Sequence, residues 1–68
     1  MKIHYDPKID AVYFKLAKGK YDASREISSS IIVDEDKNGK VLGIEILDAT
    51  KNINAFNPKN PRSSLSTS

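Results

Sequence analysis

The chain has 68 residues with 11 Lys and Arg against 9 Asp and Glu, and it contains one histidine and no cysteine. A chain this short forms one domain and buries only about 60% of the surface that its unfolded form exposes. Without cysteine it has neither disulfides nor thiolate metal ligands, so we expect a homo-oligomer or a protein that docks on a small protein partner.

The charges are spread along the chain, because residues 1–56 carry 9 positive and 9 negative side chains and the excess comes from Lys59 and Arg62. A phosphate-binding surface needs clustered cations. The one cluster is Lys15, Lys18 and Lys20. A solvated turn explains these lysines best, and we expect no nucleic-acid partner. Nucleic-acid contact through this cluster and the basic tail is the alternative function.

The composition separates a domain from a tail. Residues 57–68 contain two prolines, four serines and a single large apolar residue, Leu65, so they bury too little surface to offset their ordering entropy. We expect a single β-rich domain over residues 1–56 and a tail that is disordered or ordered by a partner. No signal peptide, lipidation motif or long apolar run is present, which indicates a cytoplasmic protein with no membrane partner.

The first elements in chain order are two strands. Residues 2–6 alternate between apolar and polar side chains, and a tight turn capped by Asp6 is expected over residues 7–10 because proline suits the first position of such a turn. Residues 11–16 form the second predicted strand. Its expected inward side chains are Val12, Phe14 and Leu16.

Residues 21–27 read as a third, charged strand, and charges on a strand are typical of a sheet edge. Residues 31–47 then form a β-hairpin, because Asn38-Gly39 accepts the positive φ angles of a two-residue type I′ turn. That turn sets Val33 opposite Ile44. One face then carries Ile31, Val33, Leu42, Ile44 and Ile46, and the other carries Ile32, Asp34, Val41, Gly43, Glu45 and Leu47.

A change of one residue in the turn would swap the faces of the incoming strand, so the register stays open. After the hairpin, residues 48–53 begin with an Asp cap and predict one short helical turn. Short turns between successive strands favour antiparallel pairing. The expected fold is therefore mainly β: a small antiparallel β-meander of four or five strands with at most one or two short helical turns.

A calcium-loop pattern overlaps the hairpin and is formed by Asp34, Asp36, Asn38, Gly39 and Glu45. A calcium loop of that kind needs a helix on each side, whereas both flanks here are β-branched and strand-like. Loop position nine would also be Leu42, an apolar side chain. We therefore expect neither a metal nor another cofactor.

Two motifs give the chain a family resemblance: Tyr5-Asp6-Pro7 followed by Asp10-Ala11 and Tyr13, and the run over residues 43–49, GIEILDA. Over about residues 2–51 the chain resembles the small prokaryotic proteins grouped as domain of unknown function 2283. The resemblance implies a cytosolic protein that stands alone. It also implies, through association with toxin-like genes, an antitoxin-like or partner-binding role.

Five residues of these motifs and their surroundings are candidates for an interaction surface: Tyr5, Asp6, Asp10, Tyr13 and Glu45. Tyrosine suits a position where one side is buried and the other meets a partner. The alternative is an enzyme that uses the three carboxylates for acid–base or magnesium chemistry. Their structural reading is that the two Asp bond to the turn backbone and Glu45 pairs with a lysine.

His4 is the single histidine, and it is expected on the polar face of the first strand. A Ser-His-Asp or Cys-His system would depend on it alone, and an exposed surface position is the more common one for histidine. The sequence therefore favours a non-enzymatic protein.

Overall fold

The computed structural model of this protein describes residues 1–61. They form β1 (Lys2–Asp6), β2 (Ala11–Lys15), β3 (Ala23–Ser28), β4 (Ile31–Glu35), β5 (Val41–Ile46) and α1 (Ala49–Asn52). All pairs of neighbouring strands are antiparallel and belong to one five-stranded sheet, which confirms the mainly β fold class. Residues 62–68, and with them most of the predicted tail, lie outside the described residues.

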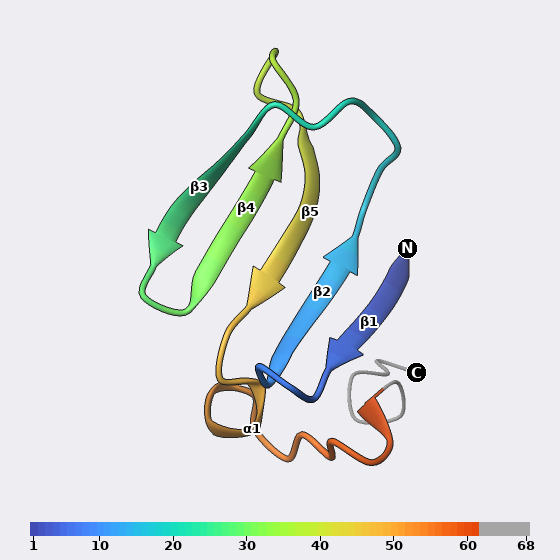
Figure 1. Cartoon of the computed structure of the whole chain (residues 1–68), viewed down its shortest axis with the longest axis vertical. Coiled ribbons are helices and arrows are strands. Elements are labelled where there is room, and N and C mark those ends of the chain that lie inside the picture. Colours follow the sequence, from blue (N-terminus) through green and yellow to red (C-terminus); the bar gives the residue numbers. More distant parts are fainter. Residues whose placement is uncertain (62–68) are drawn as a thin grey trace.

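The strand order in the sheet is β1-β2-β5-β4-β3, so the strands do not follow one another as in a simple meander. After β2 the chain passes over the ends of β5 and β4 to reach β3 at the far edge (Figure 1). This crossover, residues 16–22, can span about 23 Å at about 3.3 Å per residue. β2 and β3 lie three positions apart in the sheet, which is about 14 Å, so the crossover is long enough to join them. β2 therefore pairs with β5 in a Greek-key-like arrangement.

Leu16 begins the crossover, and the prediction that it points inward is wrong. Its side chain is 44% exposed, because the strand ends at Lys15 and the Leu16 amide donates to the carbonyl oxygen of Leu42 at 2.9 Å. The predicted edge position of the charged strand is confirmed, since within the described part of the chain β3 pairs only with β4.

The turn between β4 and β5 differs from the predicted type I′ turn. The Gly39 amide donates to the Asp36 carbonyl oxygen at 3.0 Å, and the Asp36 amide donates to the Lys40 carbonyl oxygen at 3.0 Å. Gly39 has a φ of 83°, whereas Asn38 is not among the residues with positive φ. This is a three-residue loop in which only the glycine adopts the left-handed conformation.

The predicted register of this hairpin is nevertheless confirmed, because Val33 lies opposite Ile44 and Ile31 opposite Ile46. A three-residue loop alone would shift every pair by one residue. A β-bulge compensates for this shift, because Leu42 on the return strand β5 is an extra residue between the pairs Asp34–Gly43 and Glu35–Val41. The bulge thus restores the side-chain alternation that a two-residue turn would have given.

The ladder separates the side chains into two faces. The apolar face carries two continuous cross-strand rows: Ile3, Phe14, Ile44 and Val33 in one, and Tyr5, Val12, Ile46 and Ile31 in the other. The second face carries the mixed row His4, Tyr13, Glu45, Ile32 and Glu26. This alternation confirms the shared face expected for Ile31, Val33, Ile44 and Ile46, whereas Leu42, expected on the same face, is the bulge residue and has no partner in the ladder.

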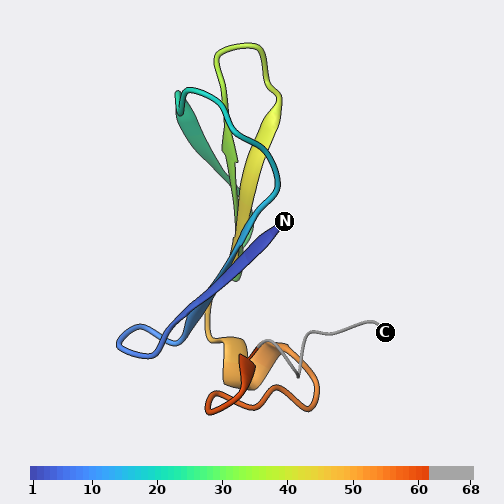
Figure 2. The same ribbon diagram turned by 90° about the vertical axis from the view of Figure 1, so that its right-hand side faces the viewer.

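A small core lies where α1 and the following segment meet the apolar face of β1 and β2. Val12, Ala49 and Phe56 are its buried residues, and Ile3, Tyr5, Phe14 and Ile53 pack around them. Figures 1 and 2 show α1 at one end of the sheet, and no helix or further strand of residues 1–61 lies over β3 and β4. The described chain is therefore a single-layered sheet whose second layer covers one end only.

Candidate interaction site

Asp10 joins the β1–β2 turn to α1. It adopts the left-handed conformation with a φ of 52°, and its carboxylate accepts hydrogen bonds from the Tyr5 hydroxyl at 2.7 Å and the Thr50 hydroxyl at 2.6 Å. The Thr50 amide lies 3.3 Å from both carboxylate oxygens. The Asp10 carbonyl oxygen also accepts from the Ala49 amide at 2.8 Å. We call this arrangement the Asp10 clamp.

The clamp replaces the helix cap expected from the sequence. Asp48 precedes α1 with a φ of 50° and makes no capping hydrogen bond with its side chain. Asp10, distant in sequence, instead satisfies an amide of the first turn of α1, as a capping residue does. The predicted side-chain cap at Asp48 is therefore wrong, because the capping carboxylate comes from Asp10 in the turn between β1 and β2.

Hydrogen bonds shift the acidity of both partners in the clamp. The Thr50 and Tyr5 hydroxyls hold the pKa of Asp10 below its ordinary value, since they stabilise the carboxylate form. The same bond raises the pKa of Tyr5, because the phenol donates to a negative group. The Tyr5 ring packs edge-on against Phe56 with centroids 5.1 Å apart. These groups therefore act together to hold α1 and the core in place.

Asp6 has a local role in the same turn. One of its carboxylate oxygens accepts a hydrogen bond from the Lys8 amide at 3.0 Å, which is an Asx turn and agrees with the predicted capping of this turn. Its strand partner across the turn is Ala11. The structural reading of the two aspartates is supported for Asp6, whereas Asp10 bonds mainly to α1.

Tyr13 and Glu45 lie opposite each other on the second face, away from the Asp10 clamp. The Tyr13 phenol crosses the sheet above Gly43, where a side chain on residue 43 would overlap it. Burial, then the negative charges of Asp34 and Glu45, raise the pKa of Tyr13. The tyrosine ring therefore covers part of the second face of the hairpin at Gly43.

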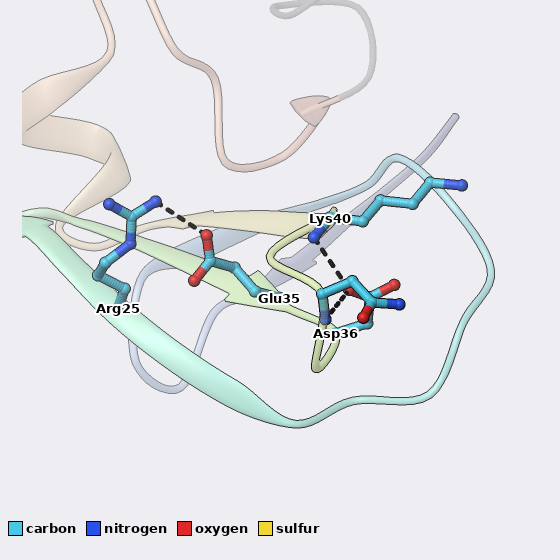
Figure 3. Close-up of polar contacts among 5 residues, drawn as sticks. Arg25, Glu35, Asp36 and Lys40 are labelled. Carbon is cyan, nitrogen blue, oxygen red and sulfur yellow. Dashed lines mark hydrogen bonds and ion pairs between the residues drawn. The ribbon is translucent and has the colours of Figure 1, made fainter.

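Glu45 has no ion pair, and the expected pairing with a lysine is absent among residues 1–61, where the single salt bridge joins Arg25 and Glu35 at 2.8 Å. Figure 3 shows this bridge between the edge strand β3 and the neighbouring β4. Figure 3 also shows Asp36, whose carboxylate accepts from the Lys40 amide at 2.9 Å.

Sequence reasoning missed a chain of hydrogen bonds on the outer strands. Tyr21 and Ser24 hydroxyls lie 2.7 Å apart, and Ser24 donates to the Asp34 carboxylate at 2.8 Å. Ser24 lies directly opposite Asp34 in the ladder. Knowing the register of β3 against β4 would have revealed this pair. The bulge between Glu26 and Ser28 shifts that register, so the alternation of side chains alone does not predict it.

The lysine cluster divides between two depressions in the surface. Lys15 and Lys18 line one of about 180 Å³ together with Lys2, which lies directly opposite Lys15 in the ladder. Lys20 lines another of about 260 Å³, beside Asp22 and Asp36. The cationic cluster is therefore built from Lys2, Lys15 and Lys18, which we call the β1–β2 lysine patch.

The three carboxylates of the enzyme alternative are not brought together as a metal site. Asp6 and Asp10 flank the β1–β2 turn, whereas Glu45 lies within β5 opposite Tyr13. Within residues 1–61 no group of three or more histidine, aspartate and glutamate side chains could hold a metal ion. The calcium-loop residues belong to the hairpin, where Asp36 accepts from the Asn38 and Lys40 amides at 2.9 Å.

These features define a class: a small β protein with one open antiparallel sheet, clamped at one end to a short helix. The chain belongs to the family described as protein of unknown function (DUF2283), whose model matches residues 2–49. No curated protein and no solved structure matches the chain. Over the part of the chain that the structure describes, no helix is long and apolar enough to cross a membrane.

Proposed function

We propose that this protein is a small, non-enzymatic protein-interaction module that self-associates in the cytoplasm. The observation that carries the proposal is the size of its core. Six apolar residues are buried among residues 1–61, and Val12 is the one large side chain that is fully buried: the set is Ala11, Val12, Val33, Leu42, Ala49 and Phe56. A core this small without staples gains stability when a further surface is covered.

The shape of the sheet supports the same proposal. A sheet that is apolar on one face is stable when another layer covers that face. In this protein α1 packs at the β1–β2 end, and Ile31, Ile44 and Ile46 on β4 and β5 are only half-buried. Association with a second molecule would cover more of this surface.

The non-enzymatic part of the proposal is supported by how the candidate carboxylates are used. The Asp10 carboxylate accepts from two hydroxyl groups and one amide of the fold. A general base must be free to take a proton from a substrate, whereas these bonds hold Asp10 in its ionised form for a structural purpose. Asp6 likewise accepts from the turn backbone.

The experiment is light scattering on the full chain during size-exclusion chromatography, at several concentrations. We expect a dimer or a larger species at micromolar concentration. A monomer at every concentration would contradict self-association. Because ligands that bind the folded state raise its stability, an increase in melting temperature with magnesium or calcium would instead favour the metal-dependent enzyme.

A partner protein is the finer part of the proposal, since the family resemblance implies antitoxin-like binding. The second face of the hairpin supports it, because Glu45 lies there without an ion pair among residues 1–61 and next to the apolar Ile32. The test is to co-purify the protein with the product of an adjacent toxin-like gene. We expect Glu45→Lys to weaken the complex at least tenfold, while Glu26→Lys on the edge strand serves as the control.

A further inference from the structure

We propose that two copies of this chain pair edge to edge through β1, antiparallel, with His4 opposite the partner's His4. This inference rests on the proposed self-association and specifies its surface. It joins the two five-stranded sheets into one continuous sheet across a two-fold axis. Edge strands pair in this way when their free backbone groups and side chains are complementary.

The outer edge of β1 is open in the described chain. Among residues 1–61, β1 forms a ladder with β2 alone. Apart from that ladder, no backbone–backbone hydrogen bond within residues 1–61 involves residues 2–6. In an antiparallel ladder, alternate residues direct their amide and carbonyl groups to opposite sides of the strand. Half of these groups in β1 are therefore directed outward, where a second strand can bind them.

Symmetry restricts the register of such a pair. A two-fold axis perpendicular to the sheet keeps the faces continuous, so each residue must lie opposite a residue of its own face. Centring the pair on His4 engages all five residues of β1. Lys2 then lies opposite the partner's Asp6, and Ile3 lies opposite the partner's Tyr5. Centring it on a neighbouring residue engages fewer residues of the strand and loses the Lys–Asp pairs.

Charge complementarity favours this register. Lys2 lies opposite Lys15 within the chain, and like charges directly opposite each other are destabilising. No salt bridge to either lysine is present among residues 1–61. The pairing places the partner's Asp6 on the other side of Lys2, on the same face. Asp6 uses one carboxylate oxygen for the Lys8 amide, and its second oxygen is directed to no hydrogen-bond partner in the described chain.

A lysine on an edge strand normally discourages pairing with other chains. In this register Lys2 instead favours a partner strand that carries a carboxylate opposite it. A second copy of β1 does so, because its Asp6 lies four residues after its Lys2. The apolar side of the strand is also complementary, because Ile3 and Tyr5 are half-buried against the core. Their pairing across the axis would extend the apolar row of the sheet into the second copy.

The opposite edge is less suited to self-pairing. A pair centred on Arg25 or Glu26 of β3 sets that residue opposite its own copy, and one centred on Ser24 sets Asp22 opposite Glu26. Every one of these registers opposes like charges. A bulge between Glu26 and Ser28 further interrupts the regular edge. In these registers β3 lacks the charge complementarity that β1 offers.

The test is a disulfide across the two-fold axis, in a protein that has no cysteine of its own. Opposite residues in an antiparallel pair have Cα atoms about 4.5–5.5 Å apart, which is within the disulfide range of about 4.4–6.8 Å. We expect His4→Cys, at an exposed position, to form a covalent dimer under mild oxidation. The matched control Lys2→Cys lies on the same face and strand, but its two copies would be offset by about 13 Å along the strand direction.

The results separate this inference from the proposed function. If light scattering shows a dimer and His4→Cys cross-links no faster than Lys2→Cys, the β1 pairing is wrong while self-association stands. A monomer contradicts both. We expect His4→Cys to cross-link at least tenfold faster.

The charge pairs provide a second test that needs no cysteine. We expect Lys2→Asp or Asp6→Lys alone to raise the dimer dissociation constant about tenfold at low salt, because each places like charges opposite one another. The double variant restores the pair in exchanged order and should recover most of the affinity. Equal weakening in the double variant would contradict the register, and circular dichroism verifies that each variant is folded.

Discussion

At the scale of single residues, Asp10 carries the most connections of the site. It couples the β1–β2 turn to α1 through the Thr50 hydroxyl and through its own carbonyl oxygen, and to β1 through the Tyr5 hydroxyl. Its left-handed backbone conformation is tolerated by aspartate more readily than by most residues. Asp10 therefore both holds α1 in place through its side chain and provides the left-handed residue of the β1–β2 turn.

Replacing Asp10 should loosen this end of the molecule. We expect Asp10→Ala to lower the melting temperature by about 5 °C, the order expected when a helix loses its cap in a domain of this size. Asp22→Ala, at an exposed position, is the control and should change the melting temperature little. Thermal melts followed by circular dichroism measure both, and equal melting temperatures would contradict the clamp.

The same carboxylate predicts a pH dependence. The pKa of Asp10 is below its ordinary value of 3.8 in the folded protein, so its stabilising effect is full above that value and is lost as the pH falls through the lower, folded pKa. The difference in melting temperature between the natural protein and Asp10→Asn should therefore be largest near about pH 6 and shrink towards about pH 2. A constant difference would show that Asp10 is not held in its ionised form.

Gly43 and Tyr13 form a second residue-scale pair. A methyl group on residue 43 would overlap the Tyr13 phenol, so we expect Gly43→Ala to destabilise the fold by about 1–3 kcal/mol, as overpacking does. In a Tyr13→Ala background the same change should cost less, because the ring is gone. Denaturant unfolding of the four proteins in this cycle measures the coupling, and additive effects would mean that the ring lies elsewhere.

At the scale of elements, the β4–β5 hairpin was predictable because its signals are local. Alternating β-branched side chains and Asn38-Gly39 lie within one short segment, and the register followed. The turn type was not predictable, because a bulge at Leu42, opposite Asp34 and Glu35, permits a three-residue loop with the same outer pairs. The sequence pattern cannot distinguish the two combinations.

The hairpin turn gives a direct test of that distinction. Only Gly39 has a positive φ in this loop, so Gly39→Ala should destabilise the protein by about 1–2 kcal/mol. Asn38→Ala should be nearly neutral, whereas a type I′ turn would make both changes costly. Chemical denaturation of the two variants decides between the turns, and comparable losses would favour type I′.

The helical element and the site show the limit of local patterns. Residues 48–53 correctly indicated a short helical turn, but the capping carboxylate comes from Asp10 and its partner Thr50 was not anticipated. Contacts between residues 40 positions apart leave no periodic signal in the sequence. For the second face, Gly43 was a hint of the contact with Tyr13, since a glycine within a strand often marks a close approach by another group.

At the scale of the whole molecule, the covered end and the open end of the sheet differ in kind. Around α1 the side chains interlock, whereas β3 is exposed along its entire length. The motif residues Tyr5 and Asp10 lie at the covered end, and Tyr13 and Glu45 lie on the other face. Four of the five candidate residues thus form two separate groups, one at the core and one on the second face, and the fifth, Asp6, bonds to the turn backbone.

Self-association should couple stability to concentration. If the dimer is the folded species that predominates, dilution shifts the equilibrium towards less stable monomers. We expect the melting temperature to fall by several degrees on about hundredfold dilution. Calorimetry, or circular dichroism in long-path cells, measures this change. His4→Cys in its oxidised, covalent form is the control and should melt independently of concentration.

The crossover between β2 and β3 also imposes an order of assembly. The β1–β2 hairpin emerges first during synthesis, but its neighbour in the sheet, β5, is complete only at Ile46. Pairing Val12 with Ile46 closes a loop that contains the whole β3–β5 unit, and such distant pairing is slow because its entropy must be lost before any contact is gained. β3, β4 and β5 are joined by local turns and can pair first. The β1–β2 hairpin and α1 then join a sheet that these three strands have already begun.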